Sequence, residues 1–321
     1  MRVGLVIPTW NGMPLLEEVM GAIDRQPGAT DLVRFAIDSG SSDATVTCLR
    51  DHGFAVQSIE QREFNHGTTR DLAISQVDAD VVLLLTQDAI PADDEWLPRL
   101  VEVYDDPKVG AAYCRQIPRS DCNPFIAQRL SEWVAGKTEL VVQEVEGEDE
   151  FVALEPLERL QRSAYDNVAG SVRRSVWQKH PFGYRRFGED VAFGKRLLLA
   201  GQRIVFQPQS AVIHSHNRSP KAEGKRIYCD HQNLKDLFGV HLLSTRQQLR
   251  ENINWARKDY GERVLALELP EAEKRDLRAW ALAYAKWSAW GMYLGGNSDR
   301  FMHGKLGWFY RCLDRWMHRG I

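Results

Sequence analysis

The stretch DVVLLLTQDAIPADDEW, residues 80–96, carries the strongest fold signal in this sequence. Its apolar run, residues 81–85, leads through Gln87 to Asp88, and the chain then turns at Pro91. An apolar run of this length between polar residues is typical of a strand that is buried on both faces. The sequence therefore predicts a central strand that delivers one carboxylate at its carboxyl end.

The segments around this strand alternate between strand-like and helix-like patterns. Strands are predicted at residues 2–8, 32–39, 55–60 and 109–116. Amphipathic helices are predicted at residues 14–26, 43–53, 68–78 and 93–106. Strands and helices that take turns indicate an α/β fold, a mostly parallel sheet with helices on both faces. In such sheets ligands bind beyond the carboxyl ends of the strands.

The second half of the chain is less regular. Residues 117–165 are acidic and contain Gly and Pro, so we expect a loop or an insertion there. A helix is predicted from Glu189 to Gly201, and it is followed by short strands at 203–208 and 211–216. Beyond about residue 237 the pattern is helical. We therefore predict a catalytic domain over residues 1–236 and a helical extension over residues 237–321.

Composition excludes several classes of protein. A chain of 321 residues with 44% hydrophobic and 26% charged residues is an ordinary globular protein. Its net charge of −3 argues against a nucleic-acid partner. Five cysteines without a CxxC pair favour a reducing compartment over a disulfide framework. Because we find no signal peptide and no apolar run long enough to span a membrane, we expect a cytoplasmic protein.

Two polar loops follow neighbouring strands of the predicted sheet. The first strand ends in IPTWNG and the second in AIDSGSSDAT. The first loop alone is explained equally well by a turn, and the second alone is better explained by one. Two such loops at adjacent strand ends favour a ligand, because a Gly-Ser loop lets a ligand lie against the backbone. The candidate ligand-binding residues in these loops are Pro8, Thr9, Asn11, Asp38, Ser39 and Gly40.

A third candidate segment is REFNHGTTRDLA, which places Asn65 and Gly67 before a helix that carries Arg70. Arginine binds diphosphate oxygens well, and the amino terminus of a helix attracts anions. A surface arginine beside a helix cap is the competing interpretation. Neither GxGxxG nor a P-loop motif follows the first strand, so the usual dinucleotide and P-loop folds are not supported.

In their order and spacing these motifs resemble the nucleotide-sugar half of the inverting GT-A glycosyltransferases of family 2. The resemblance covers residues 3–216. In that family the second strand ends in D-[DS]-G-S-x-D-x-T, which residues 38–45 match, and the fourth strand ends in a metal-binding D-x-D. An acidic pair that begins a helix over the acceptor is matched by Glu189 and Asp190. Four sequence segments are most similar to rhamnosyltransferases of bacterial surface-polysaccharide (O-antigen) assembly: FNHGTTR, LLLTQDAIP, YCRQIPR and AVIHSHNRS.

The resemblance implies an enzyme that transfers a sugar, rhamnose from dTDP-rhamnose, to a hydroxyl of a growing lipid-linked glycan. Asp190 would be the general base. The implied nucleotide-binding residues are Pro8, Thr9, Asn11, Asp38, Ser39, Gly40, Asn65, Gly67, Arg70 and Gln87. The implied contacts to the acceptor or to the donor sugar are Arg115, Gln116, Asn167 and Glu189.

Three alternatives stay open at this point. The same site could use another UDP- or GDP-sugar. The chain could also be a non-catalytic glycan-binding or scaffold protein on a decayed transferase fold. A sugar-nucleotide nucleotidyltransferase would need a Gly-rich basic loop after the first strand, and PTWNGMP lacks one.

The D-x-D position departs from the family pattern. The chain has TQD there, so Asp88 is the carboxylate and Thr86 stands where the first Asp would be. His214 and His216 alternate on a predicted strand, so both imidazoles can point to the same side and supply further ligands. We expect a divalent cation, Mg²⁺ or Mn²⁺, and imidazole ligands favour Mn²⁺. Transfer without a metal remains an alternative.

The C-terminal third combines tryptophans with basic residues. One predicted helical face contains Trp280, Ala283, Tyr284, Trp287 and Leu294, and another contains Trp308, Phe309, Cys312, Leu313, Trp316 and Met317. A basic, Trp-rich amphipathic helix is typical of a protein that lies on an anionic membrane surface, here the cytoplasmic face of the inner membrane. Packing on the catalytic domain, or on a second copy of the chain in a homodimer, explains the same pattern.

Overall fold

The computed structural model describes residues 1–320, and they form two compact units. The first unit comprises Met1–His216, and the second begins at Asn217. The predicted boundary after residue 236 falls inside helix α10 (Pro220–Phe238). This helix begins much earlier than the boundary, because Ser219 caps it and Pro220 occupies its first position.

The first unit is built on one mixed sheet. Its strands are β1 (Val3–Thr9), β2 (Val33–Asp38), β3 (Ala55–Ser58), β4 (Val81–Leu85), β5 (Ile90–Pro91), β6 (Val109–Ile117), β7 (Val141–Gln143), β8 (Ala169–Arg173) and β9 (Arg203–Ile213). Their order is β3-β2-β1-β4-β8-β6-β9-β5, and β7 pairs with β9. Strands β1 to β4 are mutually parallel, as are β6 and β9, whereas β8 runs antiparallel between β4 and β6. The predicted α/β fold is confirmed.

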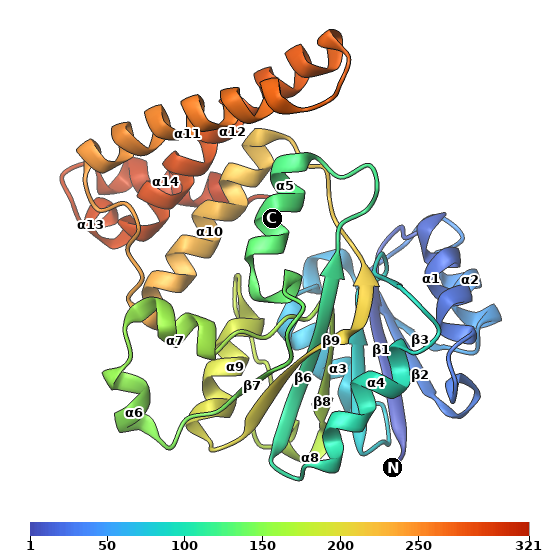
Figure 1. Ribbon diagram of the computed structural model, residues 1–321. Coiled ribbons are helices and arrows are strands. Elements are labelled where there is room, and N and C mark those ends of the chain that lie inside the picture. The colour runs from blue at the N-terminus through green and yellow to red at the C-terminus, as the bar shows by residue number, and fades with distance from the viewer. Residues whose placement is uncertain (321) are drawn as a thin grey trace. The chain divides into compact units, whose positions relative to one another are not determined.

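Helices cover both faces of this sheet. One face carries α1 (Leu15–Asp24), α2 (Thr45–Asp51) and α4 (Trp96–Glu102), and the other carries α3 (His66–Ser75) and α9 (Glu189–Leu199) (Figure 1). Strand β4 lies between the two layers, and every side chain from Val81 to Leu85 is fully buried. The apolar run is therefore a strand that is buried on both faces, as the sequence predicted.

The prediction of a loop over residues 117–165 is wrong in part. This segment forms α5 (Pro124–Glu132), α6 (Glu148–Ala153), α7 (Pro156–Arg162) and strand β7, which extends the sheet beside β9. The buried Gln143 fixes β7, because its amide donates to the carbonyls of Arg162 and Ala164 while its oxygen accepts from the Tyr113 hydroxyl. These long-range bonds leave no local sequence pattern, so they could not be predicted.

The two short strands predicted after α9 are one continuous strand, β9. A register shift between Cys114 and Arg115, opposite Gln207 and Ala211, marks a bulge in its pairing with β6. Extra residues in one strand of a pair bend it and re-aim the side chains beyond. Here the bulge precedes the carboxyl end of β9, after which His214 and His216 follow.

The second unit is helical, as predicted. It contains α10, α11 (Arg246–Ala266), α12 (Glu271–Gly296), α13 (Ser298–Met302) and α14 (Gly307–His318); the short α8 (Arg174–Trp177) belongs to the first unit. Helices α10 and α12 pack so closely that a Cβ added to Gly291 would lie 2.5 Å from the carbonyl oxygen of Gly224. Among the described residues, every helix is too short or too polar to cross a membrane.

Candidate active site

The loop after β2 is held together by Asp38. Its carboxylate accepts from the Thr9 hydroxyl at 3.1 Å, from the Ser41 hydroxyl at 2.5 Å, and from the amides of Gly40 and Ser41 at 3.1 and 2.9 Å. Ser39 in turn donates through its amide and its hydroxyl to the carbonyl of Thr9. Because a carboxylate has about four acceptor positions, this network occupies Asp38 fully. The loops after β1 and β2 are thus fastened to each other.

The loop after β1 is braced from two further sides. The amide of Gln87 accepts from the backbone N–H of Trp10 at 2.8 Å and donates to its carbonyl at 3.0 Å. Asn11, which has a positive φ of 45°, accepts from the backbone N–H of Ser42 at 2.8 Å. This bracing leaves Trp10 48% exposed just beyond the end of the strand, whereas Pro8 within the strand is partly buried. We did not predict Trp10 as a site residue, although an exposed aromatic ring beside a Gly-Ser loop is a recognisable signal.

The segment before α3 connects this edge to helix α9. Asn65 caps α3 by accepting from the backbone N–H groups of Gly67 and Thr68, and its amide donates to the carbonyl of Arg185 at 2.7 Å. Gly67 is required because a Cβ there would overlap the carbonyl oxygen of Gly183. Both residues therefore hold the chain that leads into α9.

Asp71, which is not among the predicted site residues, strengthens this connection. Its carboxylate accepts from the indole of Trp177 at 2.7 Å and from the backbone N–H groups of Phe182 and Gly183 at 2.9 and 2.7 Å. Asp71 follows Arg70 directly in the TTRDLA stretch. A charged residue on a predicted buried face of a helix is the signal that could have identified it.

Arg70 is buried, with only 3% of the residue exposed. Its guanidinium donates to the carbonyl of His66 at 2.9 Å, to Glu189 at 3.4 Å and to the carbonyl of Asn167 at 3.4 Å. The predicted contact of Arg70 with the donor diphosphate would therefore need this arginine to move, and the competing interpretation of a surface arginine is wrong. In this structure Arg70 holds the carboxylate of Glu189, which also accepts from the Asn167 amide at 3.2 Å.

Three carboxylates lie close together around the start of α9. Burial and the charges of Glu189 and Asp166 raise the pKa of Asp190 well above its ordinary value of 3.8. The backbone N–H of Val191 and the charge of Arg70 oppose that rise of the pKa only partly. Burial also raises the pKa of Asp166. A partly exposed carboxylate with a raised pKa is a stronger base than an ordinary one, so Asp190 can accept a proton.

Asp88, His214 and His216 form the second half of the site. The Nε2 atoms of the two imidazoles lie 3.1 Å apart, and they lie 3.7 and 3.4 Å from the nearer oxygens of Asp88. A cation held at about 2.1 Å by two neighbouring ligand atoms separates those atoms by about 3.0–3.4 Å. Two of the three separations fall in this range and the third, between His214 and Asp88, is slightly longer, so the three predicted ligands could hold one divalent cation after a small adjustment.

Gln116 joins the carboxylates around α9 to the predicted cation ligands. Its amide nitrogen donates to Asp166 at 2.5 Å, so its oxygen faces Nδ1 of His214 at 2.9 Å. This orientation places the proton of His214 on Nδ1 and leaves the lone pair of Nε2 directed toward Asp88 and His216. Neighbouring Arg119, which we did not predict, donates to the carbonyl of Asp88 at 2.5 Å. Arg115 is partly buried on β6, and the Nε atom of its guanidinium has no hydrogen-bond partner among residues 1–320.

A second group of potential metal ligands lies outside this site, on α1 and α2. Glu17, Cys48 and His52 approach one another there. Burial and the neighbouring Glu17 raise the pKa of the Cys48 thiol to about 12. The thiol therefore stays protonated and donates to Glu17 at 3.2 Å. This group does not involve the strand ends.

Two curated proteins resemble this chain along most of its length. The O-antigen chain rhamnosyltransferase RfbN of Salmonella typhimurium is 30% identical over 239 residues, which are 71% of each chain. The O-antigen chain rhamnosyltransferase WbaN of Salmonella anatum is 27% identical over 70% of this chain and 69% of its own.

A solved structure shows the same fold. The mannosyltransferase PcManGT of Pyrobaculum calidifontis, in complex with GDP-Man and Mn²⁺, superposes with a TM-score of 0.50 at 17% identity, covering 98% of this chain and 84% of its own. The family model for glycosyl transferase family 2 matches residues 5–166, half of the chain. Together with the 30% identity to RfbN, this match shows that the chain belongs to glycosyl transferase family 2.

Proposed function

We propose that this glycosyltransferase transfers rhamnose from dTDP-rhamnose to a hydroxyl of a growing, lipid-linked surface glycan, with inversion at the anomeric carbon. The observation that carries the proposal is the pairing of a raised-pKa carboxylate, Asp190, with a three-ligand cation site through Gln116 and Asp166. The two Salmonella relatives, both O-antigen rhamnosyltransferases, support the choice of sugar and of acceptor.

In the proposed reaction Asp190 takes the proton of the acceptor hydroxyl as its oxygen attacks carbon one of rhamnose. The bond from carbon one to the phosphate oxygen breaks, and the electron pair leaves with dTDP. Attack opposite to the leaving group inverts the anomeric centre. Arg70 and Asn167 fix the carboxylate of Glu189 beside Asp190, where its charge raises the pKa of Asp190 and so its basicity.

Asp88, His214 and His216 would hold a divalent cation, and two imidazoles favour Mn²⁺ over Mg²⁺. When bound, the cation would offset the negative charge of the departing diphosphate. The loops fastened by Asp38 and Gln87 would receive the nucleotide, with the exposed Trp10 ring available to stack on the base.

Calorimetric titration of the full chain with dTDP, UDP and GDP, each with and without Mn²⁺, tests the donor site. We expect dTDP to bind most tightly, and more tightly with Mn²⁺. Tighter binding of UDP or GDP would overturn the choice of rhamnose donor but keep the transferase. Binding of none of the three would favour the non-catalytic scaffold.

A transfer assay with dTDP-rhamnose and a lipid-linked acceptor completes the test. The Asp190→Asn variant should lose transfer while its affinity for dTDP stays within about twofold. If wild-type and variant transfer equally, Asp190 is not the base. The product's anomeric configuration, read by NMR, should be opposite to that of the donor.

A further inference from the structure

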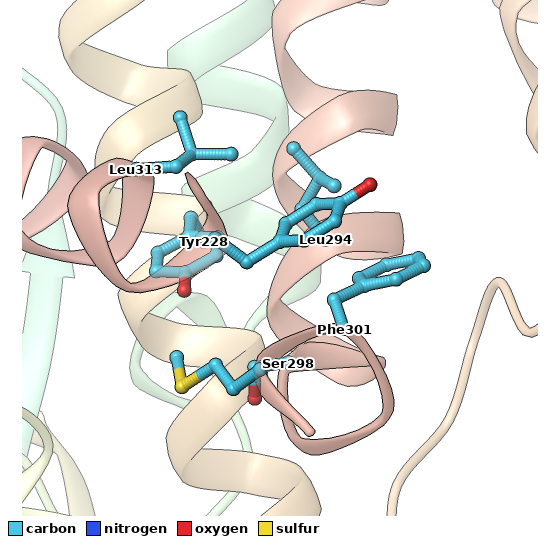
Figure 2. Close-up of a pocket in the computed structure, with 7 residues that line it drawn as sticks. Tyr228, Leu294, Ser298, Phe301 and Leu313 are labelled. Atoms are coloured by element: carbon cyan, nitrogen blue, oxygen red, sulfur yellow. The ribbon is translucent and has the colours of Figure 1, made fainter. Parts of the chain in front are cut away.

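Helix α14 has two apolar sides, and they have different environments. The inner side packs within the helical unit: Met317 is 3% exposed, and Leu313 lines a small pocket with Tyr228 and Phe301 (Figure 2). The buried Asp314 fixes this side by accepting from the Tyr228 hydroxyl at 2.9 Å. The inner side therefore has the packing partners that an amphipathic helix requires.

The outer side of α14 is apolar as well, but it is exposed. Trp308 is 64% exposed, Trp316 is 38% exposed, and Cys312 lies between them at helical spacing. Phe309 is 49% exposed beside this stripe, and Leu306, just before the helix, is 57% exposed. Large apolar side chains that gather on one exposed stripe mark an interaction surface more often than scattered ones do.

Cations flank this stripe on both sides. Arg311 and Arg315 follow one another at i, i+4 spacing along one side of the helix, Arg319 comes directly after its last residue, and all three are exposed. On another side, the ammonium groups of Lys221 and Lys225 in α10 lie 5.1 and 5.3 Å from the centre of the Trp316 ring. These residues belong to the same helical unit.

The exposed part of residues 300–320 lacks acidic side chains. In residues 300–320 the sequence has one acidic residue, Asp314, and it lies on the buried side of α14. A second copy of the chain docked here through the same face would bring the two arginine rows together, which costs free energy. Anionic lipid headgroups would instead meet every cation, while the tryptophan rings enter the boundary of the acyl chains.

We propose that the outer side of α14, defined by Leu306, Trp308, Phe309 and Trp316 with its flanking arginines and lysines, binds the surface of an anionic bilayer. Tryptophan prefers the membrane–water interface because its ring is apolar and its N–H is polar. Long arginine and lysine side chains can reach the headgroups from either flank. The proposal does not depend on which sugar the enzyme transfers, but it would bring the enzyme to a membrane that carries a lipid-linked acceptor.

Co-sedimentation of the full chain with vesicles tests this surface. Vesicles of phosphatidylcholine mixed with phosphatidylglycerol should bind the protein at least about tenfold more tightly than phosphatidylcholine alone, and added salt should weaken the binding. Trp308→Glu should reduce binding to the anionic vesicles roughly tenfold or more. Arg315→Ala should reduce it roughly fivefold, the effect of one basic residue near such a surface.

The helical unit offers a matched control in Trp255 of α11, which is 60% exposed. Trp255→Glu makes the same chemical change at similar exposure, outside the proposed surface, and should leave vesicle binding unchanged. Equal losses in Trp255→Glu and Trp308→Glu, or equal binding to neutral and anionic vesicles, would overturn the proposal. A wild-type dimer that Trp308→Glu converts to a monomer would assign the face to a second copy instead.

A fluorophore on Cys312 gives a second, direct measurement. Cys48, Cys114 and Cys229 are buried, so a Cys122→Ser background directs an environment-sensitive label to Cys312. Its emission should shift to the blue with anionic vesicles and stay constant with neutral ones. Transfer to a water-soluble acceptor analogue should be unchanged in Trp308→Glu, so failure of this proposal can be distinguished from failure of the proposed function.

Discussion

The nucleotide side and the acidic side of the candidate site differ in how the hydrogen bonds of their polar groups are satisfied. On the nucleotide side the carboxylate of Asp38 is fully occupied by protein donors, and Gln87 makes two bonds to the backbone of Trp10. On the acidic side Oδ1 of Asn167 and Nε of Arg70 have no hydrogen-bond partner among residues 1–320. The nucleotide side is a preformed cradle, whereas the acidic side keeps a buried acceptor and a buried donor available for a further polar group.

The largest effect that would test this contrast is expected from Asp190→Asn. Transfer should fall by about 100- to 10,000-fold, because a general base contributes about that much. At a pH above the raised pKa of Asp190 the melting temperature should rise as well, since the substitution removes an ionised group from beside Glu189 and Asp166. Steady-state kinetics and thermal unfolding measure the two effects. A fall in both activity and stability would show that Asp190 is structural.

The pH dependence follows from the same carboxyl. Asp190 must be ionised to accept a proton, so transfer should rise as the pH increases through its raised pKa, at a midpoint above 3.8. Its stabilising contribution is complete below the unfolded pKa and is lost as the pH rises through the folded pKa. Unfolding measured against pH should therefore show a loss of stability in wild type that Asp190→Asn lacks. Identical pH profiles for the two proteins would contradict this assignment.

The link between the acidic side and the predicted cation ligands is tested by Gln116→Leu. Without the amide oxygen, Nδ1 of His214 loses its acceptor, and the direction of the Nε2 lone pair is no longer fixed. We expect Mn²⁺ to bind about 10- to 100-fold more weakly, the usual cost of removing such a supporting bond. Calorimetry with Mn²⁺ and dTDP measures this loss. Unchanged Mn²⁺ affinity with reduced transfer would make Gln116 a substrate contact instead.

The nucleotide side could be predicted from the sequence better than the contacts of the acidic side, for physical reasons. Burial of β4 and the polar strand ends are local patterns, so the fold and the positions of Asp38 and Asp88 could be predicted from them. The bond from Gln116 to Asp166 spans 50 residues, and the bond from Gln116 to His214 spans 98. No periodicity encodes such pairs. The burial of Arg70 against Glu189 likewise depends on helices that meet only in the folded sheet.

The exposed ring of Trp10 tests whether the cradle receives a base. Trp10→Ala should weaken dTDP binding roughly tenfold, because stacking of a base on an aromatic side chain contributes about 1–3 kcal/mol. The fold should be unaffected, since the side chain is 48% exposed. Trp255→Ala, on the helical unit, is the matched control and should leave the affinity unchanged. An unchanged affinity in Trp10→Ala would place the base elsewhere.

The smallest effect is expected from Gln87→Ala, and it asks whether the cradle is rigid because of its internal bonds. The substitution removes both bonds to the backbone of Trp10 but leaves the ring itself in place. If the bonds preorganise the loop, dTDP binding should weaken about fivefold, close to the net contribution of one hydrogen bond. The double variant Trp10→Ala with Gln87→Ala should then bind as Trp10→Ala does, because Gln87 acts through the position of that ring. Additive losses would instead show that Gln87 contacts the nucleotide directly, and the contrast between the preformed cradle and the acidic side would lose its simplest support.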